Sequence, residues 1–451
     1  MPLNKLGRRS LALIFAPALA AAPLAAHAAG FALLESSASG LGNSYAGSAV
    51  LAEDASTIFY NPAGLTYLPG TNFVGSLDLI QPSARFNNSG SVGTGTPAVA
   101  ASQRPLGGNG GDAGSLAAVP ALFISHQVAP RWTIGLGINA PFGQKTEYSA
   151  DWIGRFQAVK SQIMTLNVNP TIAYKVNDAV SLGFGADYQR IDADFTQAVN
   201  YSAQVFAKAG AGAAGLITNP EGSGEIKGND SAWGWNAGAL IQLAPQTRLG
   251  IAYRSQIKYK VNGTVTFSGA PNTGVGAIDS NFVNGNAFTN VTLPDSLSVS
   301  LSHQLNSRWT LMGNVMWTGW SRIKDLTFFR DNGTQLSTTN ENWRDTYRVG
   351  LGANYRVNDQ WLLRSGVAYD QTPVPSDTIT PRLPDQSRTW LSFGTQYRIS
   401  PAMNFDVGYA HLFAKDTSIN QNNGSTLING LINGTYKVSV DIFGAQLSYR
   451  F

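Results

Sequence analysis

Apolar and polar residues alternate with a period of two along most of the chain after residue 70. The segment 296–305, SLSVSLSHQL, places its leucines and its valine on one face and its serines and Gln304 on the other. The segment 343–357, WRDTYRVGLGANYRV, repeats the pattern and adds arginines to the polar face. Such alternation is typical of β-strands with one face in an apolar environment and the other in a polar one.

About fourteen segments carry this pattern, and an even number suits a closed antiparallel barrel. Short connections such as APR, VND and APQT alternate with long connections rich in Gly, Asn, Ser and Thr. This rhythm is typical of an outer-membrane barrel with short periplasmic turns and long outer loops, whereas a soluble all-β sandwich or propeller does not predict it. The predicted strands lie near residues 71–85, 118–128, 131–142, 162–176, 179–195, 231–243, 247–262, 288–304, 308–323, 343–357, 360–371, 387–399, 402–414 and 437–451.

The first 28 residues read as a cleaved secretory signal peptide. They combine Lys5, Arg8 and Arg9 with the apolar run LALIFAPALAAAPLAA and a small-residue cleavage site. Removing three basic residues and no acids lowers the formal net charge from +4 to +1. The net charge of the mature chain therefore gives little reason to expect a nucleic-acid partner. The chain has no cysteine, which excludes disulfides and thiol chemistry.

Both ends of the mature chain fit a plugged barrel. The last strand alternates up to Phe451, similar to the signal by which outer-membrane barrel proteins are recognised for assembly. A fourteen-stranded lumen is too wide for side chains alone to fill, so residues 29–70 are predicted to form a plug, or hatch, within the barrel formed by 71–451. Leu51, Ala52, Glu53 and Ala55 favour a helix there, and Asn61 before Pro62 is expected to end one.

The hatch segment, AGF…SSASGLGNSYAG…AEDASTIFYNPAGL, resembles the FadL-type outer-membrane transporters of long-chain fatty acids and hydrocarbons. The resemblance includes the Asn-Pro-Ala element at Asn61, Pro62 and Ala63. It continues through NAPFG, WIGR, WGWNAG, LPDSLSVS, WTGWS, WRDTYRVGLG, RSGVAYDQTPVP and PRLPDQSRTW, which are spread over almost the whole mature chain. It implies a fourteen-stranded barrel with an amino-terminal hatch, in agreement with the strand pattern.

The resemblance also implies a path for an apolar ligand. Outer loops capture the ligand, a pocket inside the barrel holds it, and a shift of the hatch amino-terminus releases it sideways into the membrane. Apolar segments at 201–217 and 275–288 could supply the capture surface. Pro141, Phe142 and Gly143 could interrupt strand pairing and form the lateral opening, because proline removes a hydrogen-bond donor and glycine weakens pairing. Alternatively, these three residues only end a strand.

Three arginines are candidate partners for a fatty-acid carboxylate. Arg344 and Arg348 project inward by alternation, and the resemblance places a basic residue near the ligand at Arg344. Arg190 also matches a basic position of the family, but alternation from Leu182 and Phe184 turns it outward unless a bulge intervenes. The competing interpretation for all three is that the arginine pairs with a protein carboxylate in a solvated lumen and does not contact the ligand.

An enzyme and a general porin are the rival functions. No Ser/His/Asp pattern accompanies the isolated histidines, and the predicted hatch disfavours an open porin. No liganding spacing supports a metal or cofactor, and no segment suggests energy coupling, so we expect passive uptake by a monomeric protein of the Gram-negative outer membrane. Expected partners are the ligand, membrane lipid and the barrel-assembly machinery. The choice between fatty acids and neutral aromatic hydrocarbons stays open.

Overall fold

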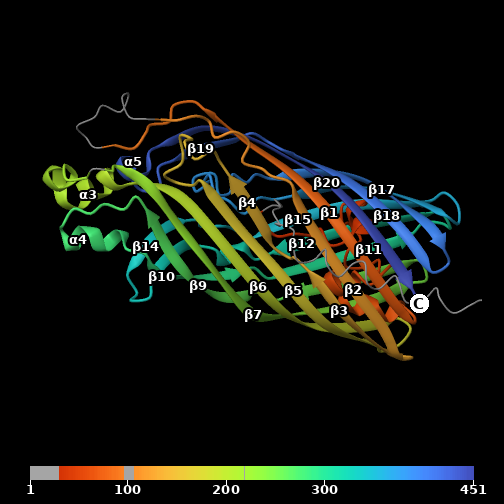
Figure 1. Cartoon of the computed structure of the whole chain (residues 1–451). Helices are drawn as coiled ribbons and strands as arrows, with labels where there is room; N and C mark the ends of the chain where they lie inside the picture. Colours follow the sequence, from red (N-terminus) through yellow and green to blue (C-terminus); the bar gives the residue numbers. More distant parts are fainter. Residues whose placement is uncertain (1–29, 96–105, 218) are drawn as a thin grey trace, which may run out of the picture.

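The computed structural model of the chain describes residues 30–95, 106–217 and 219–451. The predicted signal peptide, residues 1–28, lies outside the described residues. Antiparallel strands form one continuous sheet that closes into an elongated barrel (Figure 1). The strands are β1 (Thr71–Asn88), β2 (Ala117–Ala129), β3 (Trp132–Asn139), β4 (Gly143–Glu147), β5 (Lys160–Lys175), β6 (Val180–Asn200), β7 (Glu221–Ala244), β8 (Thr247–Arg254), β9 (Ile257–Ser268), β10 (Gly285–Leu293), β11 (Ser296–Gln304), β12 (Trp309–Thr318), β13 (Asp325–Arg330), β14 (Gln335–Asn340), β15 (Thr346–Arg356), β16 (Trp361–Asp370), β17 (Arg388–Ser400), β18 (Met403–Ala414), β19 (Thr417–Gln421) and β20 (Ile432–Arg450).

The barrel wall has fourteen strand positions, which confirms the predicted number. Four positions are shared by two successive strands, namely β3 with β4, β8 with β9, β10 with β11, and β18 with β19. The wall closes where β1 pairs with β20 over a long antiparallel register from Asn72–Arg450 to Asn88–Gly434. The hairpin of β13 and β14 extends from β10.

Several segments that read as loops contain regular structure. Strands β6 and β7 run well beyond their predicted ends, and β4, β14 and β19 lie within predicted loops. The long connections also hold the helices α3 (Tyr201–Ala214), α4 (Gly276–Asp279) and α5 (Thr426–Asn429) and the 3₁₀ turn η4 (Ser280–Phe282), whereas the 3₁₀ turn η5 (Trp320–Arg322) replaces the end of the predicted strand 308–323. The Gly, Asn and Ser residues of these segments predict loops, because they favour turns in isolation. Tertiary pairing overrides that preference in the folded chain.

The outer face of the wall is apolar, with aromatic pairs at the end that carries the short turns. The Trp132 ring packs against Tyr174 with the centroids 4.5 Å apart, and similar tilted cross-strand pairs join Trp309 to Tyr355 and Trp361 to Tyr397. Rings at strand ends mark a membrane interface, and the short turns identify this interface as the periplasmic one. Trp390 of β17 differs from these interface rings, because it is fully buried inside the barrel. Among the described residues, no helix is long and apolar enough to span a membrane.

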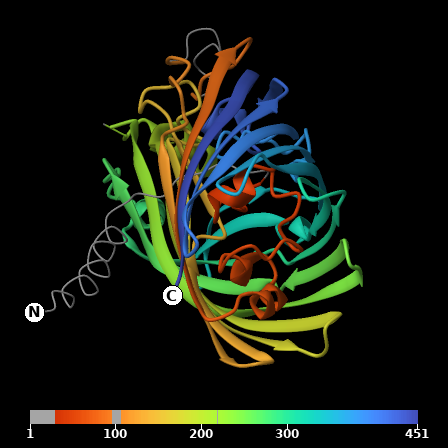
Figure 2. The ribbon, with the colours of Figure 1, turned by 90° about the vertical axis from the view of Figure 1, so that its right-hand side faces the viewer.

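Residues 30–68 lie inside the ring of strands, where they form the hatch (Figure 2). They contain α1 (Ala38–Leu41), α2 (Thr57–Tyr60) and the 3₁₀ helix η2 (Pro62–Tyr67). Asn61 is extended and ends α2, as the following proline predicts. The helix expected at residues 51–55 is absent, because Ala52 adopts φ 51°, a left-handed conformation that an α-helix cannot include.

The hatch docks on wall glycines that allow its backbone to approach closely. A Cβ atom added at Gly250 would lie 1.9 Å from the carbonyl oxygen of Ala49, and one at Gly366 would lie 2.2 Å from the carbonyl carbon of Asn43. An ion pair adds to this fit, since Arg364 of β16 contacts Glu53 of the hatch at 2.7 Å. The hatch body is therefore held by shape and by charge.

Candidate ligand-binding site

Two cavities lie between the hatch and the barrel wall. The outer cavity, on the side of the long loops, encloses about 1210 Å³ including its mouth. Nine of its nineteen lining residues are apolar, and the exposed Asn290 and Asp325 lie at its rim. Its lining comprises Phe31, Gln144, Ile163, Phe195, Asn290, Val291, Thr292, Arg322, Ile323, Lys324, Asp325, Leu326, Thr327, Phe329, Glu341, Trp343, Thr380, Arg382 and Leu383.

Arg382 brings a positive charge into this cavity from the loop between β16 and β17. Its backbone carbonyl accepts hydrogen bonds from Gln144 and Thr146, two inward side chains of β4, which pull the loop into the lumen. In the described chain, the hydrogen bonds found for its guanidinium go to neutral groups, Ser161 Oγ at 3.0 Å and Gln197 Oε1 at 2.6 Å. Burial lowers the pKa of Arg382 to about 10, so it stays charged at neutral pH.

Glu341 is the acid of the outer cavity. Its carboxylate accepts a hydrogen bond from Trp343 Nε1 at 2.9 Å, and its side chain is buried. Burial raises its pKa to about 7, while the Trp343 hydrogen bond and the nearby Arg382 charge act in the opposite direction. The lining has two other cations. Arg322 is already paired with Asp295 at 2.9 Å, and Lys324 is exposed at the rim. Arg382 is therefore the cation best placed to meet an anionic ligand.

Four aromatic rings close the inner end of the outer cavity, and we call them the aromatic junction. Phe31 of the hatch lies 5.1 Å from Trp320, 5.8 Å from Trp343 and 5.8 Å from Phe142, measured between ring centroids. All four side chains are buried and meet edge to face, a favourable geometry for aromatic rings. Phe31 is the member that the hatch contributes, so a shift of the amino-terminal segment would open the junction.

The inner cavity lies behind the junction and encloses about 720 Å³ including its mouth. Hatch residues such as Leu33, Leu34 and Phe59 form one side, and the wall forms the other. Pro141 and Phe142 lie in that wall, so the inner cavity reaches the predicted lateral opening.

The wall is interrupted at residues 140–142, between β3 and β4. Both strands pair with β5, from Asn139–Asn167 on one side of the break to Gly143–Met164 on the other. Pro141 and Phe142 therefore break a strand position within the wall rather than merely ending it. On the other side of the break, the ladder between β2 and β3 stops at Leu122–Ile138.

The hatch amino-terminus covers this interruption by strand-like pairing. Leu33 donates its backbone N–H to the Pro141 carbonyl at 2.8 Å, and Gly143 donates to the Phe31 carbonyl at 2.9 Å. Ala32 and Phe142 form the antiparallel bridge between these two bonds. Farther out, Gly30 N–H donates to Asp385 Oδ2 at 2.9 Å. We call residues 30–33 the latch.

Two of the three predicted arginine ligands are exposed and line neither cavity. Arg344 is exposed just before β15, because alternation does not hold through the irregular residues 341–345, and Trp343 points inward in its place. Arg190 also faces outward and pairs with Asp192 at 2.7 Å, as strand alternation alone indicates. Neither is positioned to contact a ligand in the outer or inner cavity.

The third arginine, Arg348, points inward but supports the hatch. It is buried, donates to the Ser44 carbonyl at 2.9 Å, and lies 4.8 Å from the Trp390 ring. It lines neither cavity. Sequence reasoning missed Arg382 because a non-periodic loop carries it, although its motif, PRLPDQSRTW, belonged to the family resemblance.

The Asn-Pro-Ala element ties the hatch to the wall. Asn61 Nδ2 donates to the carbonyls of Ala49 at 2.7 Å and Ala239 at 3.1 Å, while its Oδ1 accepts from the Ala63 N–H at 3.1 Å. The backbone of Pro62 and Ala63 lies against Gly183, where an added Cβ would be 2.3 Å away. The element therefore has a structural role at the hatch–wall contact.

The two predicted capture segments meet above the barrel. Tyr201 of α3 packs against Phe282 at 4.9 Å, and Lys208 donates to Asn281 at 2.8 Å. Leu216, Val275 and Val283 are exposed nearby in sequence. The loops thus combine a small apolar core with exposed apolar side chains.

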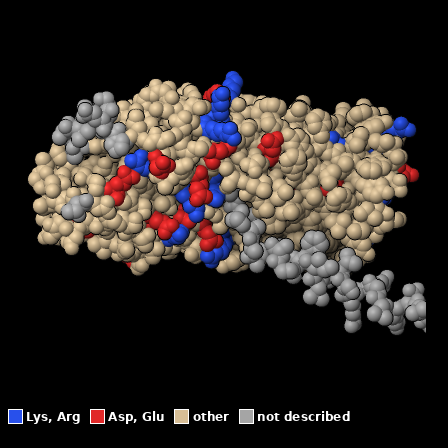
Figure 3. Space-filling view, turned by 45° about the horizontal axis from the view of Figure 1, so that its top comes forward, with Lys and Arg blue, Asp and Glu red and all other residues tan. Residues whose placement is uncertain are grey.

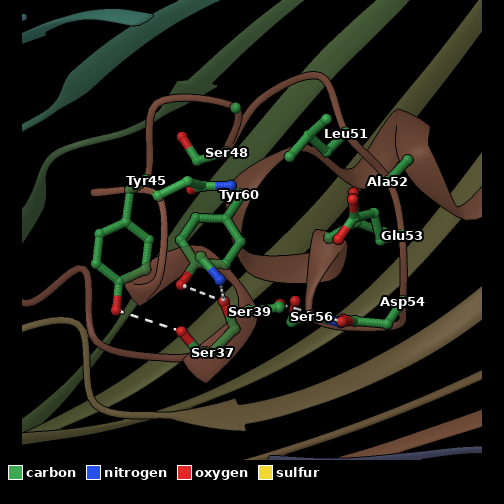
Figure 4. A pocket seen from close by; sticks show the side chains of 14 residues that line it. Ser37, Ser39, Tyr45, Ser48, Leu51, Ala52, Glu53, Asp54, Ser56 and Tyr60 are labelled. Atoms are coloured by element: carbon green, nitrogen blue, oxygen red, sulfur yellow. Dashed lines mark hydrogen bonds between the residues drawn. The ribbon is translucent and has the colours of Figure 1, made fainter. Parts of the chain in front are cut away.

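A smaller pocket lies within the hatch itself (Figure 4). Serine hydroxyls, Glu53 and Asp54 surround it, and Tyr60 separates it from the inner cavity, because this tyrosine lines both. The Tyr60 hydroxyl donates to the Leu34 carbonyl at 2.7 Å, which fixes the ring. The polar lining suits water better than an acyl chain.

A closed barrel with an apolar outer face, an internal hatch and apolar cavities defines an outer-membrane channel for hydrophobic compounds. The chain belongs to the family described as "Outer membrane protein transport protein (OMPP1/FadL/TodX)", whose profile matches residues 19–451. The family members are transport channels of the outer membrane and not enzymes.

Individual relatives cover nearly the whole chain. The "Long-chain fatty acid transport protein" of Salmonella typhi is 29% identical over 450 residues, covering 94% of this chain and 95% of the relative. The "Outer membrane protein P1" of Haemophilus influenzae is 29% identical over 479 residues, covering 97% and 98%. A solved FadL homologue from Pseudomonas aeruginosa superposes with a TM-score of 0.82 at 25% identity, covering 93% and 99%. The toluene transporter TodX of P. putida superposes with a TM-score of 0.66 at 17% identity, covering 88% and 94%, and this likeness shows the fold alone.

Proposed function

We propose that this channel takes up long-chain fatty acids, with Arg382 as the partner of the carboxylate. The observation that carries the proposal is a half-buried cation whose hydrogen-bond partners are neutral, in a cavity where nine apolar residues can contact an acyl chain. An ionised carboxylate is costly to bury unless a cation and hydrogen bonds receive it, and a guanidinium can receive it with two bonds. Each methylene of the tail that leaves water contributes about 0.8 kcal/mol.

The proposed path begins at the outer loops and ends in the membrane. The apolar surface of 201–217 and 275–288 concentrates the ligand, and the outer cavity holds it with the carboxylate at Arg382. Displacement of Phe31 opens the aromatic junction to the inner cavity. Release of the latch then exposes the interruption at Pro141, Phe142 and Gly143, through which the ligand leaves sideways. Transport is passive on this path, because binding and diffusion suffice.

The first experiment compares ligands that differ only in the head group. Binding of a radiolabelled long-chain fatty acid, the alcohol of equal chain length, and toluene is measured on purified protein, with Arg382→Gln and Arg344→Gln as matched variants. We expect the acid to bind more tightly than the alcohol, and only Arg382→Gln to remove the difference. A charge-assisted hydrogen bond is worth about 1.5–3 kcal/mol, so the expected loss is roughly tenfold to a hundredfold.

A channel for neutral aromatic hydrocarbons is the alternative. Toluene binding that survives Arg382→Gln, combined with equal affinity for acid and alcohol, would favour it and refute the acid assignment. The fold alone does not decide, because relatives of both kinds share it.

The second experiment tests the latch with a reversible crosslink. The chain has no native cysteine, and Ala32 and Phe142 are bridge partners, so Ala32→Cys with Phe142→Cys places two thiols within disulfide reach. We expect oxidation to stop fatty-acid uptake in cells and reduction to restore it. The control crosslinks Ser83→Cys to Ser439→Cys, partners on β1 and β20 far from the latch. Unchanged uptake with a locked latch would refute lateral release.

A further inference from the structure

A band of charged side chains crosses the outer face of the wall. Figure 3 shows Lys, Arg, Asp and Glu gathered in a narrow band across the barrel, with mostly uncharged surface on either side. On β4 to β7 it contains four basic and four acidic residues, which we call the charged band. They are Lys145, Glu147, Lys160, Arg190, Asp192, Asp194, Glu225 and Lys227.

Strand alternation shows that the charged band faces away from the lumen. On β6, Leu182, Phe184 and Tyr188 are exposed on the outer face, and Arg190 continues the same row. On the antiparallel strand β7, the outward Trp233 is 67% exposed and likewise lies on the periplasmic side of Glu225 and Lys227. The side chains of the band therefore meet the surroundings of the barrel and take no part in the lumenal site.

The height of the band matches a lipid head-group layer. Ten residues separate Val180, at the periplasmic end of β6, from Arg190. At about 3.3 Å per residue and a tilt of roughly 40°, this corresponds to roughly 25 Å along the membrane normal, the height of the apolar belt of such barrels. The charged band thus begins where the hydrocarbon ends, on the side of the long outer loops.

Four of the charges form a network of both signs, and the other four form the pairs Lys145–Glu147 and Arg190–Asp192. Asp194 Oδ2 receives Lys160 at 2.7 Å and Lys227 at 3.7 Å, and Lys227 also contacts Glu225 at 2.6 Å. The other oxygen of Asp194, Oδ1, has no hydrogen-bond partner among the described residues. Asp192, Asp194 and Lys227 line a depression in the wall, so the network is concave rather than a flat surface.

We propose that the charged band binds the phosphorylated glycolipid of the outer leaflet. Phosphate groups in such a leaflet are bridged by divalent cations, so the leaflet presents alternating negative and positive charges. Lys160, Lys227 and Arg190 are donors for the phosphates, and the more exposed acids Glu147, Asp192 and Glu225 face the bridging cations. Exposed ion pairs are individually worth only about 0–1 kcal/mol, so the network exchanges partners at little cost.

The test uses the full mature protein in nanodiscs of phosphatidylcholine with Mg²⁺. Native mass spectrometry measures binding of a bisphosphorylated lipid A and of its dephosphorylated form. The variant is Lys160→Gln with Lys227→Gln, and the matched control is Arg131→Gln with Lys175→Gln at the periplasmic end. Melting temperatures report that both variants remain folded, since all four side chains lie on the barrel surface.

We expect wild type and control to prefer the phosphorylated form by about tenfold or more, and the band variant to lose that preference. Chelating Mg²⁺ is expected to reduce it in the wild type as well. Equal binding of the two lipids by wild type would overturn the proposal, as would a preference that survives in the band variant. A preference unaffected by chelation would overturn the role given to the acids.

Discussion

The charge state of Glu341 should control how tightly the outer cavity holds an anion. Glu341 and Arg382 line the same cavity, so an ionised Glu341 repels the carboxylate that Arg382 attracts. Replacing it by glutamine removes the charge and retains an oxygen that can accept the Trp343 Nε1 hydrogen bond, found at 2.9 Å. Glu341→Gln therefore isolates electrostatics from packing.

The size of the effect follows from the pKa of Glu341. Burial raises this pKa from 4.5 to about 7, which corresponds to about 3 kcal/mol against ionisation. A bound anion raises the pKa further, because like charges disfavour the charged form, so ligand binding takes up a proton above pH 7. The affinity should then fall by up to a factor of ten per pH unit in that range, and roughly tenfold between pH 6 and 8.5.

The assay must keep the ligand charge constant. A long-chain alkyl sulfonate stays ionised throughout, whereas a fatty acid would protonate at low pH, so the sulfonate reports on the protein alone. Isothermal titration at pH 6, 7 and 8.5 gives the affinity, with the alcohol of equal length as a neutral reference. We expect a pH-dependent affinity for the sulfonate, a flat one for the alcohol, and a flat and tighter one for the sulfonate in Glu341→Gln.

Two results would contradict this reasoning. A sulfonate affinity that does not change between pH 6 and 8.5 in the wild type would mean that Glu341 stays in one state or lies too far from the ligand. An unchanged pH dependence in Glu341→Gln would assign the titration to another group.

Three further predictions concern the hatch. Gly250→Ala should shift the hatch and raise ion conductance in planar bilayers, because the added Cβ would lie 1.9 Å from the Ala49 carbonyl oxygen. The control Gly313→Ala, whose nearest contact would be at 3.5 Å, should leave the conductance unchanged. Equal conductance of the two variants would refute the close-docking argument. Asn61→Ala should make the hatch susceptible to protease by removing its hydrogen bonds to Ala49 and the wall, at about 1–3 kcal/mol; unchanged digestion would contradict the role of Asn61. Burial raises the pKa of Glu35 to about 7, so the folded state binds the proton more tightly than the unfolded chain. Thermal stability should therefore fall by up to about 3 kcal/mol as pH rises from about 4.5 to 7. Glu35→Gln should lack this fall.

The barrel and its plug could be predicted because each depends on local patterns. Period-two alternation survives wherever a strand has lipid on one side, and Asn61 before Pro62 ends a helix whatever the tertiary context. Alternation also oriented Arg190 correctly, with its partner Asp192 on the same outer face. These features require no knowledge of which segments meet in space.

The ligand cation could not be predicted in the same way. Arg344 was placed inward by extending the alternation of β15 backwards, but the strand begins at Thr346 and Asn342 has φ 45°, so the phase is lost before Arg344. Arg382 lies in a loop that is held in the lumen by contacts with distant strands, among them the hydrogen bonds from Gln144 and Thr146 to its carbonyl. Such contacts are set by tertiary structure and leave no periodic signal.

The latch joins two barriers of the proposed path in one segment. Phe31 carries a ring of the aromatic junction, and its carbonyl accepts the Gly143 N–H that helps to cover the wall interruption. The two backbone bonds at Pro141 and Gly143 are worth about 0.5–1.5 kcal/mol each, which is comparable with burying a few methylenes. A ligand tail that displaces the Phe31 ring therefore supplies enough free energy to break the pairing that closes the exit. On this path the exit opens when an acyl chain is already at the junction, and the wall stays closed to other solutes.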